Sequence, residues 1–298
     1  MNKTGWIIYN GNLPSNKFLD FAQMLQAAAT RKNSDTVIYK NNELLTLLGS
    51  DEIHILTKDK MNLPDYVVFT DKDLYLAKQL ALLGIPVFNR AKAIETSDDK
   101  IATYQQLAMH RLPIPKTIIS PKVFFRNQNE PSYPDLDTII AKLGLPMIVK
   151  ESFGSFGEQV YLIQNKEELQ EKVTELQGKA FMFQEFISSS FGRDLRIQVV
   201  GNRVVAAMKR ITTNDFRANV TVGGSMEAYD PTDLEKELAI QATKVIGADF
   251  AGVDLLFGQN DQPLICEINS NAHIRNLLDC TGINVADFII DYILESIK

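Results

Sequence analysis

The 298-residue chain has little cysteine and no long apolar run. Its two cysteines, Cys266 and Cys280, cannot build a disulfide framework, which suits the reducing cytoplasm. Nowhere do about 18 consecutive apolar residues offer a membrane-spanning helix, and the apolar stretch at residues 6–9 is too short for a signal peptide. The net charge of −6 argues against a general binder of nucleic acid or of membrane surfaces. We therefore expect a cytoplasmic protein with no nucleic-acid or membrane partner.

Two familiar nucleotide-binding motifs are also absent. Residues 1–97 alternate strand-like and helix-like segments, which is typical of a small parallel sheet. They contain neither GxGxxG nor GxxxxGK[ST], so the sheet carries no dinucleotide fingerprint and no Walker loop. We expect this part, in which residues 41–48 are predicted as a short helix, to supply a wall of a substrate site. The length of the chain suggests two or three domains.

Two apolar strands with oxygen-bearing side chains lie near the C-terminus. Residues 252–257 and 263–269 flank a polar turn, a pattern that predicts a β-hairpin. Because side chains alternate along a strand, Glu267 and Asn269 share a face, and Asp254 on the partner strand can point the same way. Two carboxylates and an amide make an oxygen site of the kind that holds Mg²⁺ beside nucleotide phosphates. The same residues could instead line a solvated sheet face, and spacing alone leaves both interpretations open.

A lysine and a small-residue loop are two further candidates. Residues 97–110 predict a helix with Ser97 as its N-cap, and Lys100 lies in the first turn, where the helix dipole disfavours a cation. Lys100 is either a solvated lysine paired with a neighbouring acid or a lysine that binds an anion. Residues 151–157 form a loop between two strands whose backbone N–H groups could bind phosphate. The alternative is an ordinary turn, although the two phenylalanines in the loop favour a function.

Seven stretches, in order, resemble an ATP-grasp ligase, and within that superfamily the RimK-like carboxylate–amine ligases. Any one stretch is weak, and the shared order and spacing carry the resemblance. The stretches are Asp99-Lys100, residues 146–150 with the Gly-Ser-Phe-Gly loop, 184–187, 192–196, Arg210 with 216–219, 251–254 and 266–269. The resemblance implies an α/β (α+β) ATP-grasp fold with three parts. They are an N-terminal pre-ATP-grasp domain at residues 1–97, a central subdomain or lid at 98–183, and a C-terminal subdomain with the metal site at 184–298.

The resemblance also implies a role for each candidate residue. Lys100 and Lys150 would contact the phosphates of ATP. The resemblance therefore favours the anion-binding interpretation of Lys100. The other residues implied for ATP are Ser152, Gly154, Ser155 and Phe156 of the loop, the adenine hinge Gln184, Glu185, Phe186 and Ile187, Asp194 for the ribose, and Asn219. The residues implied for two Mg²⁺ ions, with Mn²⁺ as an alternative, are Asp254, Glu267 and Asn269. Arg210 would stabilise the transferred phosphoryl group, and Arg217 would line the phosphate and substrate region with Asn219.

The implied chemistry explains why such groups are needed. A carboxylate is repelled by a polyanion, so magnesium, lysine and arginine must neutralise the γ-phosphate. The product is an acyl phosphate, which an amine attacks to form an amide while the loop at residues 154–157 excludes water as a lid. No covalent nucleophile is required, which agrees with the lack of a convincing Ser-His-Asp or Cys-His set.

We therefore predict a ligase that joins an amino acid such as L-glutamate to a peptide or small-molecule carboxylate. Relatives suggest a homodimer or homotetramer. Two alternatives are a dipeptide- or D-alanine-ligase-like enzyme and a non-catalytic ATP-binding regulator.

The sequence departs from the family after Asn269. RimK-like proteins usually carry a small residue, proline and glycine soon after this asparagine, whereas this chain reads SNAHIRN at residues 270–276. Arg275 could clamp a substrate carboxylate with two hydrogen bonds, and His273 could assist the incoming amine. A surface arginine and a helix-capping histidine are the alternatives. The departure leaves the substrate open and does not affect the ATP chemistry.

Overall fold

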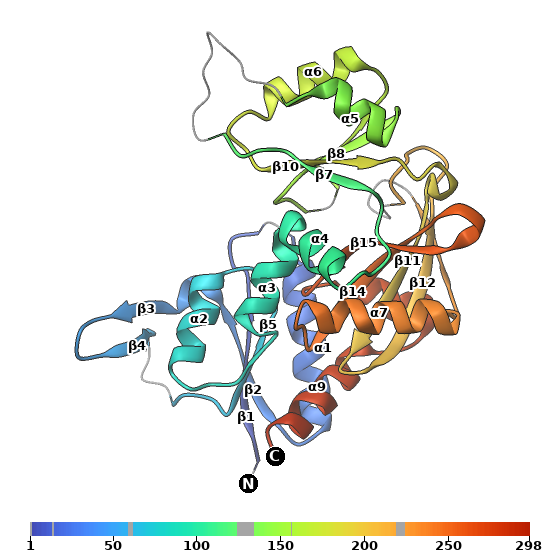
Figure 1. The fold of residues 1–298 in the computed structure, drawn as a ribbon. Helices are drawn as coiled ribbons and strands as arrows, with labels where there is room; N and C mark the ends of the chain where they lie inside the picture. Colours follow the sequence, from blue (N-terminus) through green and yellow to red (C-terminus); the bar gives the residue numbers. More distant parts are fainter. Residues whose placement is uncertain (1, 14, 59–61, 124–133, 156, 219–223) are drawn as a thin grey trace.

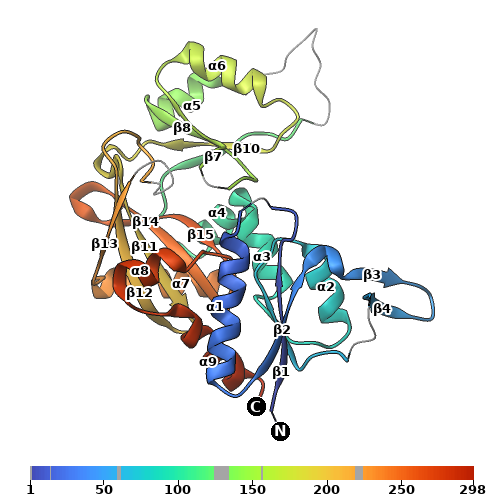
Figure 2. The same cartoon turned by 180° about the vertical axis from the view of Figure 1, so that it is seen from behind.

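The computed structural model of this chain describes residues 2–13, 15–58, 62–123, 134–155, 157–218 and 224–298. Three larger β-sheets with flanking helices and one two-stranded hairpin make up the fold, and Figures 1 and 2 show them from opposite sides. Within these described ranges, no helix is long and apolar enough to cross a lipid bilayer.

The first sheet is parallel, with the strand order β2-β1-β5-β6, and this confirms the small parallel sheet expected for the N-terminal part. Helix α1 connects β1 to β2, and α2 connects β5 to β6, because parallel neighbours need a crossover between them. The elements of this part are β1 (Thr4–Tyr9), α1 (Lys17–Arg31), β2 (Asp35–Lys40), β5 (Tyr66–Phe69), α2 (Leu74–Leu82), β6 (Val87–Phe88) and α3 (Ala91–Asp98).

The short helix predicted for residues 41–48 is wrong. Only a 3₁₀ turn, Asn41–Glu43, forms there, and it is followed by the strand β3 (Leu45–Leu48), which pairs antiparallel with β4 (Ile53–Leu56). The amide of Gly49 donates to the carbonyl of Glu52 at 2.9 Å and closes the turn between the two strands. The turn residues after a short apolar run favour a hairpin over a helix.

The second sheet is antiparallel, with the strand order β7-β10-β8-β9. Helices α5 and α6 cover one face, where Ile139 and Leu169 pack against Val149 and Phe183 in a separate core. The other face is turned toward the rest of the molecule (Figure 1). The elements of this part are β7 (Thr117–Ile119), α5 (Leu136–Leu143), β8 (Met147–Glu151), β9 (Val160–Ile163), α6 (Lys166–Glu175) and β10 (Phe181–Glu185).

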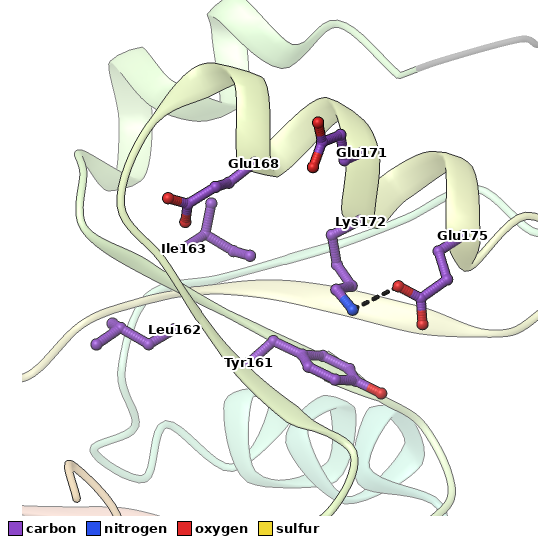
Figure 3. A pocket seen from close by; sticks show the side chains of 7 residues that line it. All are labelled: Tyr161, Leu162, Ile163, Glu168, Glu171, Lys172 and Glu175. Carbon is purple, nitrogen blue, oxygen red and sulfur yellow. Dashed lines mark hydrogen bonds and ion pairs between the residues drawn. The ribbon is translucent and has the colours of Figure 1, made fainter.

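A hollow lies between β9 and α6 on this second part (Figure 3). The ammonium of Lys172 lies 3.9 Å from the ring centroid of Tyr161 and 2.6 Å from the carboxylate of Glu175. None of the residues expected to bind ATP or metal lines this hollow. It is therefore separate from the candidate site.

The third sheet has the strand order β13-β12-β11-β14-β15 and is antiparallel throughout. Helix α7 packs on one face through Leu238 and Ala242, against Leu195, Ile197 and Val253. The hairpin expected from the sequence is confirmed as β14 and β15. The elements of this part are β11 (Arg193–Val200), β12 (Arg203–Ile211), β13 (Ser225–Ala228), α7 (Asp233–Val245), β14 (Phe250–Phe257), β15 (Pro263–Asn269), α8 (Arg275–Thr281) and α9 (Val285–Ser296).

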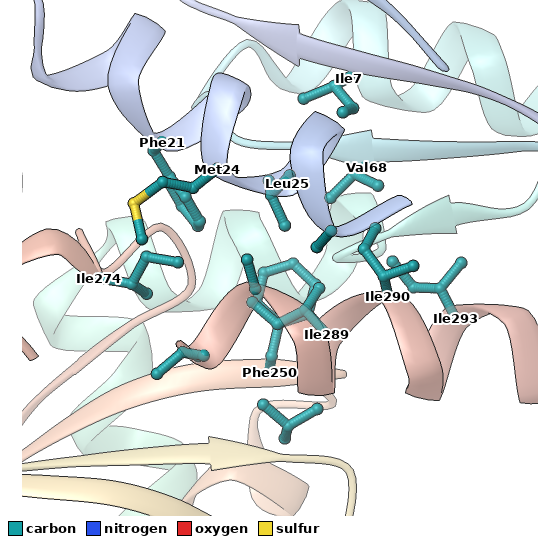
Figure 4. Packing of buried hydrophobic residues seen from close by; sticks show 14 of the residues in the cluster. Ile7, Phe21, Met24, Leu25, Val68, Phe250, Ile274, Ile289, Ile290 and Ile293 are labelled. Carbon is teal, nitrogen blue, oxygen red and sulfur yellow. The ribbon is translucent and has the colours of Figure 1, made fainter. Parts of the chain in front are cut away.

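The first and third sheets share one hydrophobic core. Phe21 and Leu25 of α1 pack between the N-terminal strands and Ile289 and Ile290 of α9, and Phe250 of β14 lies in the same cluster (Figure 4). These side chains are almost fully buried, so the contact between the two parts is dry and close-packed. The core joins the N-terminal sheet to the third sheet at Val200 and Phe250, which pair across β11 and β14.

The expected domain limits, 1–97, 98–183 and 184–298, remain a prediction. Strand β10 crosses the second limit, since Gln184 and Glu185 still pair with β8. Leu107 of α4 (Lys100–Met109), which falls within the expected central subdomain, packs in the core of the third sheet. Stretches near the limits therefore pack with both neighbouring parts.

The shared core predicts a large loss of stability when it is truncated. Leu25→Ala should lower the free energy of unfolding by about 2–5 kcal/mol, because it removes a buried side chain and leaves a cavity. Leu45→Ala is the matched control: its side chain is 62% exposed, and its loss should cost less than about 0.5 kcal/mol. Urea unfolding followed by circular dichroism measures both. Equal costs for the two variants would contradict the shared core.

Candidate active site

Three neighbouring strands bring charged side chains into one row across the third sheet. Asp254 of β14 lies directly opposite Arg196 of β11 and opposite Glu267 of β15. Cross-strand partners point to the same face of a sheet, so these three side chains stand side by side. Leu195 and Ile197, on either side of Arg196, point the other way into the core beneath α7. The expectation that Asp254 and Glu267 share a face is confirmed.

A β-bulge at Cys266 gives β15 this orientation. Asp254 pairs with Glu267, and the next residue of β14, Leu255, pairs with Ile265, so Cys266 is the extra residue. The bulge lets Ile265 and Ile268, three residues apart, both enter the core, which strict alternation would forbid. Glu267 is thereby held on the charged face.

Asn269 also lies on the charged face, opposite Gly252. A Cβ atom at Gly252 would clash with Ala272, and it would lie 3.1 Å from Cδ of Arg196. Glycine therefore leaves the space that this face needs.

A buried cluster of two arginines and two aspartates lies in and next to this row. Arg196 binds Asp254 with two hydrogen bonds of 2.5 and 2.7 Å, and Arg210 binds Asp194 with two of 2.6 Å. Nη2 of Arg210 also lies 3.0 Å from Oδ2 of Asp254, so it joins the two pairs. Burial would raise the pKa of Asp254, but Arg196 and Arg210 outweigh burial and lower it. Burial raises the pKa of Asp194 to about 6, even though Arg210 opposes this shift.

The donor chemistry of this face fits magnesium. Asp254, Glu267 and Asn269 offer only oxygen ligands, which Mg²⁺ prefers. Across the described part of the chain, no three His, Cys, Asp or Glu side chains gather in a metal-binding group, so the amide of Asn269 is needed to complete a set of three. A cation at Asp254 would also have to compete with Arg196 and Arg210 for the carboxylate.

Lys100 is buried against the small-residue loop, so its interpretation as a solvated lysine is wrong. Its ammonium donates to the carbonyl of Gly154 at 2.9 Å, and its amide donates to the carbonyl of Ser152 at 2.9 Å. Burial lowers the pKa of Lys100, while the charge of Glu267 on β15 opposes this shift. The helix start therefore holds the loop close to the charged face of the third sheet.

The sequence predicted Ser97 as the N-cap of this helix, and that prediction is wrong. The N-cap is Asp99. The carboxylate of Asp99 accepts from the amides of Ile101 and Ala102, and it also accepts from the hydroxyl of Ser152. Residue 99 has an extended backbone that separates α3 from α4. Ser97 lies inside α3, and its hydroxyl donates to Ser270 instead.

Lys150 connects the second sheet to β15 of the third. It is buried at the end of β8, and its ammonium lies 3.8 Å from Sγ of Cys266 and 5.7 Å from the ring centroid of Tyr104. Burial alone would lower the pKa of Lys150, but Cys266, Tyr104 and Glu267 outweigh burial and raise it. The ammonium therefore stays charged beside the strand that carries Glu267.

The predicted adenine hinge spans the last two residues of β10 and the two residues that follow it. The side-chain amide of Gln184 donates to the hydroxyl of Thr117 at 2.9 Å. The carboxylate of Glu185 accepts from the backbone amide of Lys116 at 2.7 Å. Phe186 packs edge-to-face on two other phenylalanine rings, and Ile187 begins the next 3₁₀ turn. Their role toward adenine remains a prediction.

Arg217 reaches the same loop as Lys100. Its Nη1 donates to the carbonyl of Gly157 at 2.6 Å, while Nε and Nη2 bind Asp215 at 2.9 and 2.7 Å. Phe156 and Asn219, which the sequence also predicted for this region, lie outside the described residues. The described loop residues are thus held by side chains from two different parts of the chain.

Arg275 and His273 are bound to helix α1. The guanidinium of Arg275 makes two hydrogen bonds to Asp20, of 2.5 and 3.0 Å, and Nε2 of His273 lies 2.6 Å from the carbonyl of Lys17. These contacts tie the loop after Asn269 to the N-terminal part. The contacts of Arg275 with described residues go to Asp20, and the predicted substrate clamp stays a prediction.

Two residues of the site escaped the sequence analysis as functional candidates. Arg196 alternates with Leu195 and Ile197, and this alternation already predicted that it lies on the face opposite the core. Tyr104 lies one helical turn after Lys100, and its hydroxyl donates to the carbonyl of Cys266 at 2.9 Å. The spacing of four residues on a helix was the available signal for Tyr104.

The chain is similar to known proteins over most of its length. A family model described as the RimK-like ATP-grasp domain matches residues 97–293. This chain belongs to the RimK-like ATP-grasp family. The match begins where the sequence resemblance begins and covers the second and third sheets with their helices.

Members of this family and its fold differ in their named activities. Beta-citrylglutamate synthase B of Danio rerio is 30% identical over 238 residues, which cover 79% of this chain and 57% of that protein. The probable alpha-L-glutamate ligase of Xanthomonas oryzae pv. oryzae is 34% identical over 225 residues, which cover 74% of this chain and 72% of that protein. The ATP-grasp ligase PsnB, solved with a precursor variant, Mg and ADP, has a TM-score of 0.70 with 15% identity and covers 100% of both chains. The chain thus has the ATP-grasp fold.

The buried arginine cluster predicts a strong dependence of stability on Arg210. Arg210→Met should lower the free energy of unfolding by about 3–5 kcal/mol, because it leaves buried carboxylates without their partner. The control is Arg31→Met, since Arg31 makes a similar pair with Asp287 on the surface and should contribute at most about 1 kcal/mol. Urea unfolding at neutral pH compares them. A cost for Arg210→Met no larger than that for Arg31→Met would show that the cluster is not buried as described.

Proposed function

We propose that this chain is an ATP-dependent carboxylate–amine ligase that forms an acyl phosphate and then an amide bond. The observation that carries the proposal is the convergence of two lysines from different elements on one acidic strand. Lys150 approaches Cys266, the neighbour of Glu267, and the charge of Glu267 acts on the pKa of both Lys100 and Lys150. A polyanion between the lysines and the acidic strand would be neutralised from both sides when a cation is bound.

The two lysines would bind the phosphates of ATP. In the structure, the ammonium of Lys100 is bound to a loop carbonyl, and the ammonium of Lys150 lies near the thiol of Cys266 and the ring of Tyr104. Both ammonium groups are largely shielded from water. Charge interactions are stronger in such a buried site than at the protein surface. A phosphate oxygen is a better partner for an ammonium than a carbonyl or a thiol, because the hydrogen bond is charge-assisted at both ends.

Asp254, Glu267 and Asn269 would hold magnesium. The ion would neutralise the phosphates and so reduce their repulsion of the attacking carboxylate. The fit of the oxygen donors, the family and the Mg and ADP named for PsnB support Mg²⁺ with ATP. Two ions, and Mn²⁺ as a substitute, are the finer part of this proposal.

The remaining steps belong to the arginines and the loop. Arg210 would stabilise the transferred phosphoryl group from its position between Asp194 and Asp254, which hold its guanidinium in place. Lys100 and Arg217 hold Gly154 and Gly157, so the loop would cover the acyl phosphate and exclude water. The amine then attacks the acyl carbon and phosphate leaves, so a protein nucleophile is not needed.

The substrates we propose are an amino acid, L-glutamate first, and a small-molecule or peptide carboxylate. Glutamate occurs in the names of both sequence relatives described above. The chain spans only 57% of the length of beta-citrylglutamate synthase B, so the activity of that whole protein is no direct guide. A dipeptide- or D-alanine-ligase-like activity is the alternative within the same chemistry. We expect the protein in the cytoplasm, as a homodimer or homotetramer.

An ADP-release screen tests the proposed reaction. Purified protein with ATP and Mg²⁺ should release ADP and phosphate only when an acid and an amine are both present. The acid is needed to form the acyl phosphate, and the amine is needed to attack it. Coupled detection of ADP over pairs of amino acids and carboxylates, followed by mass measurement of the product, identifies the amide. ATP binding without ADP release for any pair would favour a non-catalytic regulator.

Removing a predicted metal ligand tests the acidic strand. Glu267→Gln should lower turnover by about 100-fold or more, because it removes a charge that positions the cation at the phosphates. The rise in melting temperature caused by ATP with Mg²⁺ should also shrink, since bound ligand stabilises the folded state. Glu227→Gln is the control, because Glu227 is an exposed glutamate of the same sheet paired with Lys209. Full turnover of Glu267→Gln would remove Glu267 from the site.

A further inference from the structure

Lys72 lies where the N-terminal sheet could bind a ligand. In the strand order β2-β1-β5-β6, successive connections run outward from β1 on one side and from β5 on the other. Open parallel sheets bind ligands beyond the carboxyl ends of the strands at such a reversal point. Asn10 follows β1 and Asp71-Lys72 follows β5, so these residues lie at that place. The carboxyl ends of the strands are turned toward the second sheet (Figure 2).

The side chain of Lys72 reaches out of its own domain. Its ammonium lies 2.5 Å from Oδ1 of Asp98 and donates to the hydroxyl of Ser155 at 3.2 Å. Ser155 follows Gly154, whose carbonyl accepts from Lys100. Two ammonium groups from different parts of the chain thus contact adjacent residues of one loop.

The two ammonium groups are close enough to repel each other. Burial lowers the pKa of Lys100 most, the charges of Glu267 and Asp98 oppose this shift, and the charge of Lys72 lowers the pKa further. Cations that converge on a partly open site favour an anion between them. The side chain of Lys72 is 42% exposed, so an anion from solution can reach it.

The carboxylate of Asp98 shows which anion the ammonium accepts at this place. It binds Lys72 in the geometry of a charge-assisted hydrogen bond, and it lies two residues before Lys100. The nucleotide already has Lys100 and Lys150 in the proposed function. Lys72 approaches the same loop from the N-terminal sheet, where the second reactant would enter.

We propose that Lys72 binds the carboxylate of the acid substrate and replaces Asp98 with it, so that the N-terminal sheet forms one side of the acid site. This inference rests on the proposed ligase function. The acid would lie between Lys72 and the phosphate lysines, with its carboxylate oxygen close to the terminal phosphate. A phosphate oxygen of ATP could bind Lys72 through the same charge-assisted hydrogen bond. The experiment distinguishes this phosphate from the carboxylate of the acid.

The test compares Lys72→Met with Lys78→Met. Lys78 is an exposed lysine of α2 that pairs with Glu95 at 3.0 Å and lies outside the site, so its variant controls for loss of a surface charge. The acid probe is the member of the panel acetate, succinate, citrate, L-aspartate and L-glutamate that gives the fastest ADP release with the wild-type protein. Lys72→Met should raise the KM for this acid by about 10- to 100-fold, the loss expected for a hydrogen bond to a charged group. The KM for ATP and the affinity for a non-hydrolysable ATP analogue should stay within about twofold, and Lys72→Arg should recover part of the affinity for the acid.

Asp98→Asn supplies a change of opposite sign. Without its carboxylate, Lys72 has no competitor, and the KM for the acid should fall several-fold. A merely structural role of the Lys72–Asp98 pair would raise this KM or leave it unchanged.

Three results would overturn the inference. The first is an unchanged acid KM in Lys72→Met, and the second is a loss of ATP-analogue affinity that matches the loss for the acid, which would assign Lys72 to phosphate. The third is a Ser155→Ala variant that reproduces the Lys72→Met effect, which would mean that Lys72 acts only by holding the loop. The failure of the ligase proposal is distinct, because the wild-type protein would then release no ADP with any acid.

Discussion

The whole site depends on opposite charges that compensate one another on a buried sheet face. Asp254 is buried and the Asp194 side chain is largely so, and burial disfavours the ionised form of both carboxylates, which Arg196 and Arg210 favour. Because each guanidinium offers a planar fork of donors, two arginines can hold both carboxylates and still remain beside Glu267. The arrangement keeps an acidic, metal-compatible strand within a hydrophobic fold. A cation that bound Asp254 would compete there with Arg196 and Arg210.

The packing of the molecule separates a rigid body from a more loosely joined part. The N-terminal and C-terminal sheets share one apolar core, in which α1 packs on α9. The second sheet has its own core beneath α5 and α6. Polar contacts through Lys100, Lys150 and Arg217 join it to the other two. Such contacts can exchange with ligand atoms at little cost, whereas a dry core cannot, so the site lies where the fold is held by exchangeable interactions.

Much of this arrangement was predictable from local patterns. The parallel strands and the hairpin of β14 and β15 follow from alternation and turn residues, whereas the bulge at Cys266 that holds Glu267 on the face of Asp254 does not. The predictions failed where two local signals compete. Residues 41–48 have no strong helix pattern. After the turn at Gly49, Leu45–Leu48 pairs with Ile53–Leu56 as a hairpin. Ser97 and Asp99 are both good caps, and the extended backbone at Asp99 decided between them.

The sequence by itself determined which side chains could carry the chemistry, because the residue types and their order along the strands depend only on the chain. It also determined the family, through motifs spread over two thirds of the length. Only the tertiary structure decided that Arg196 binds Asp254, that Arg275 binds Asp20 and that Lys72 meets Ser155. These pairs lie 58, 255 and 83 residues apart, so no local pattern specifies them. They form because the packing of sheets and helices on their apolar faces brings polar groups from distant parts of the chain close enough to pair.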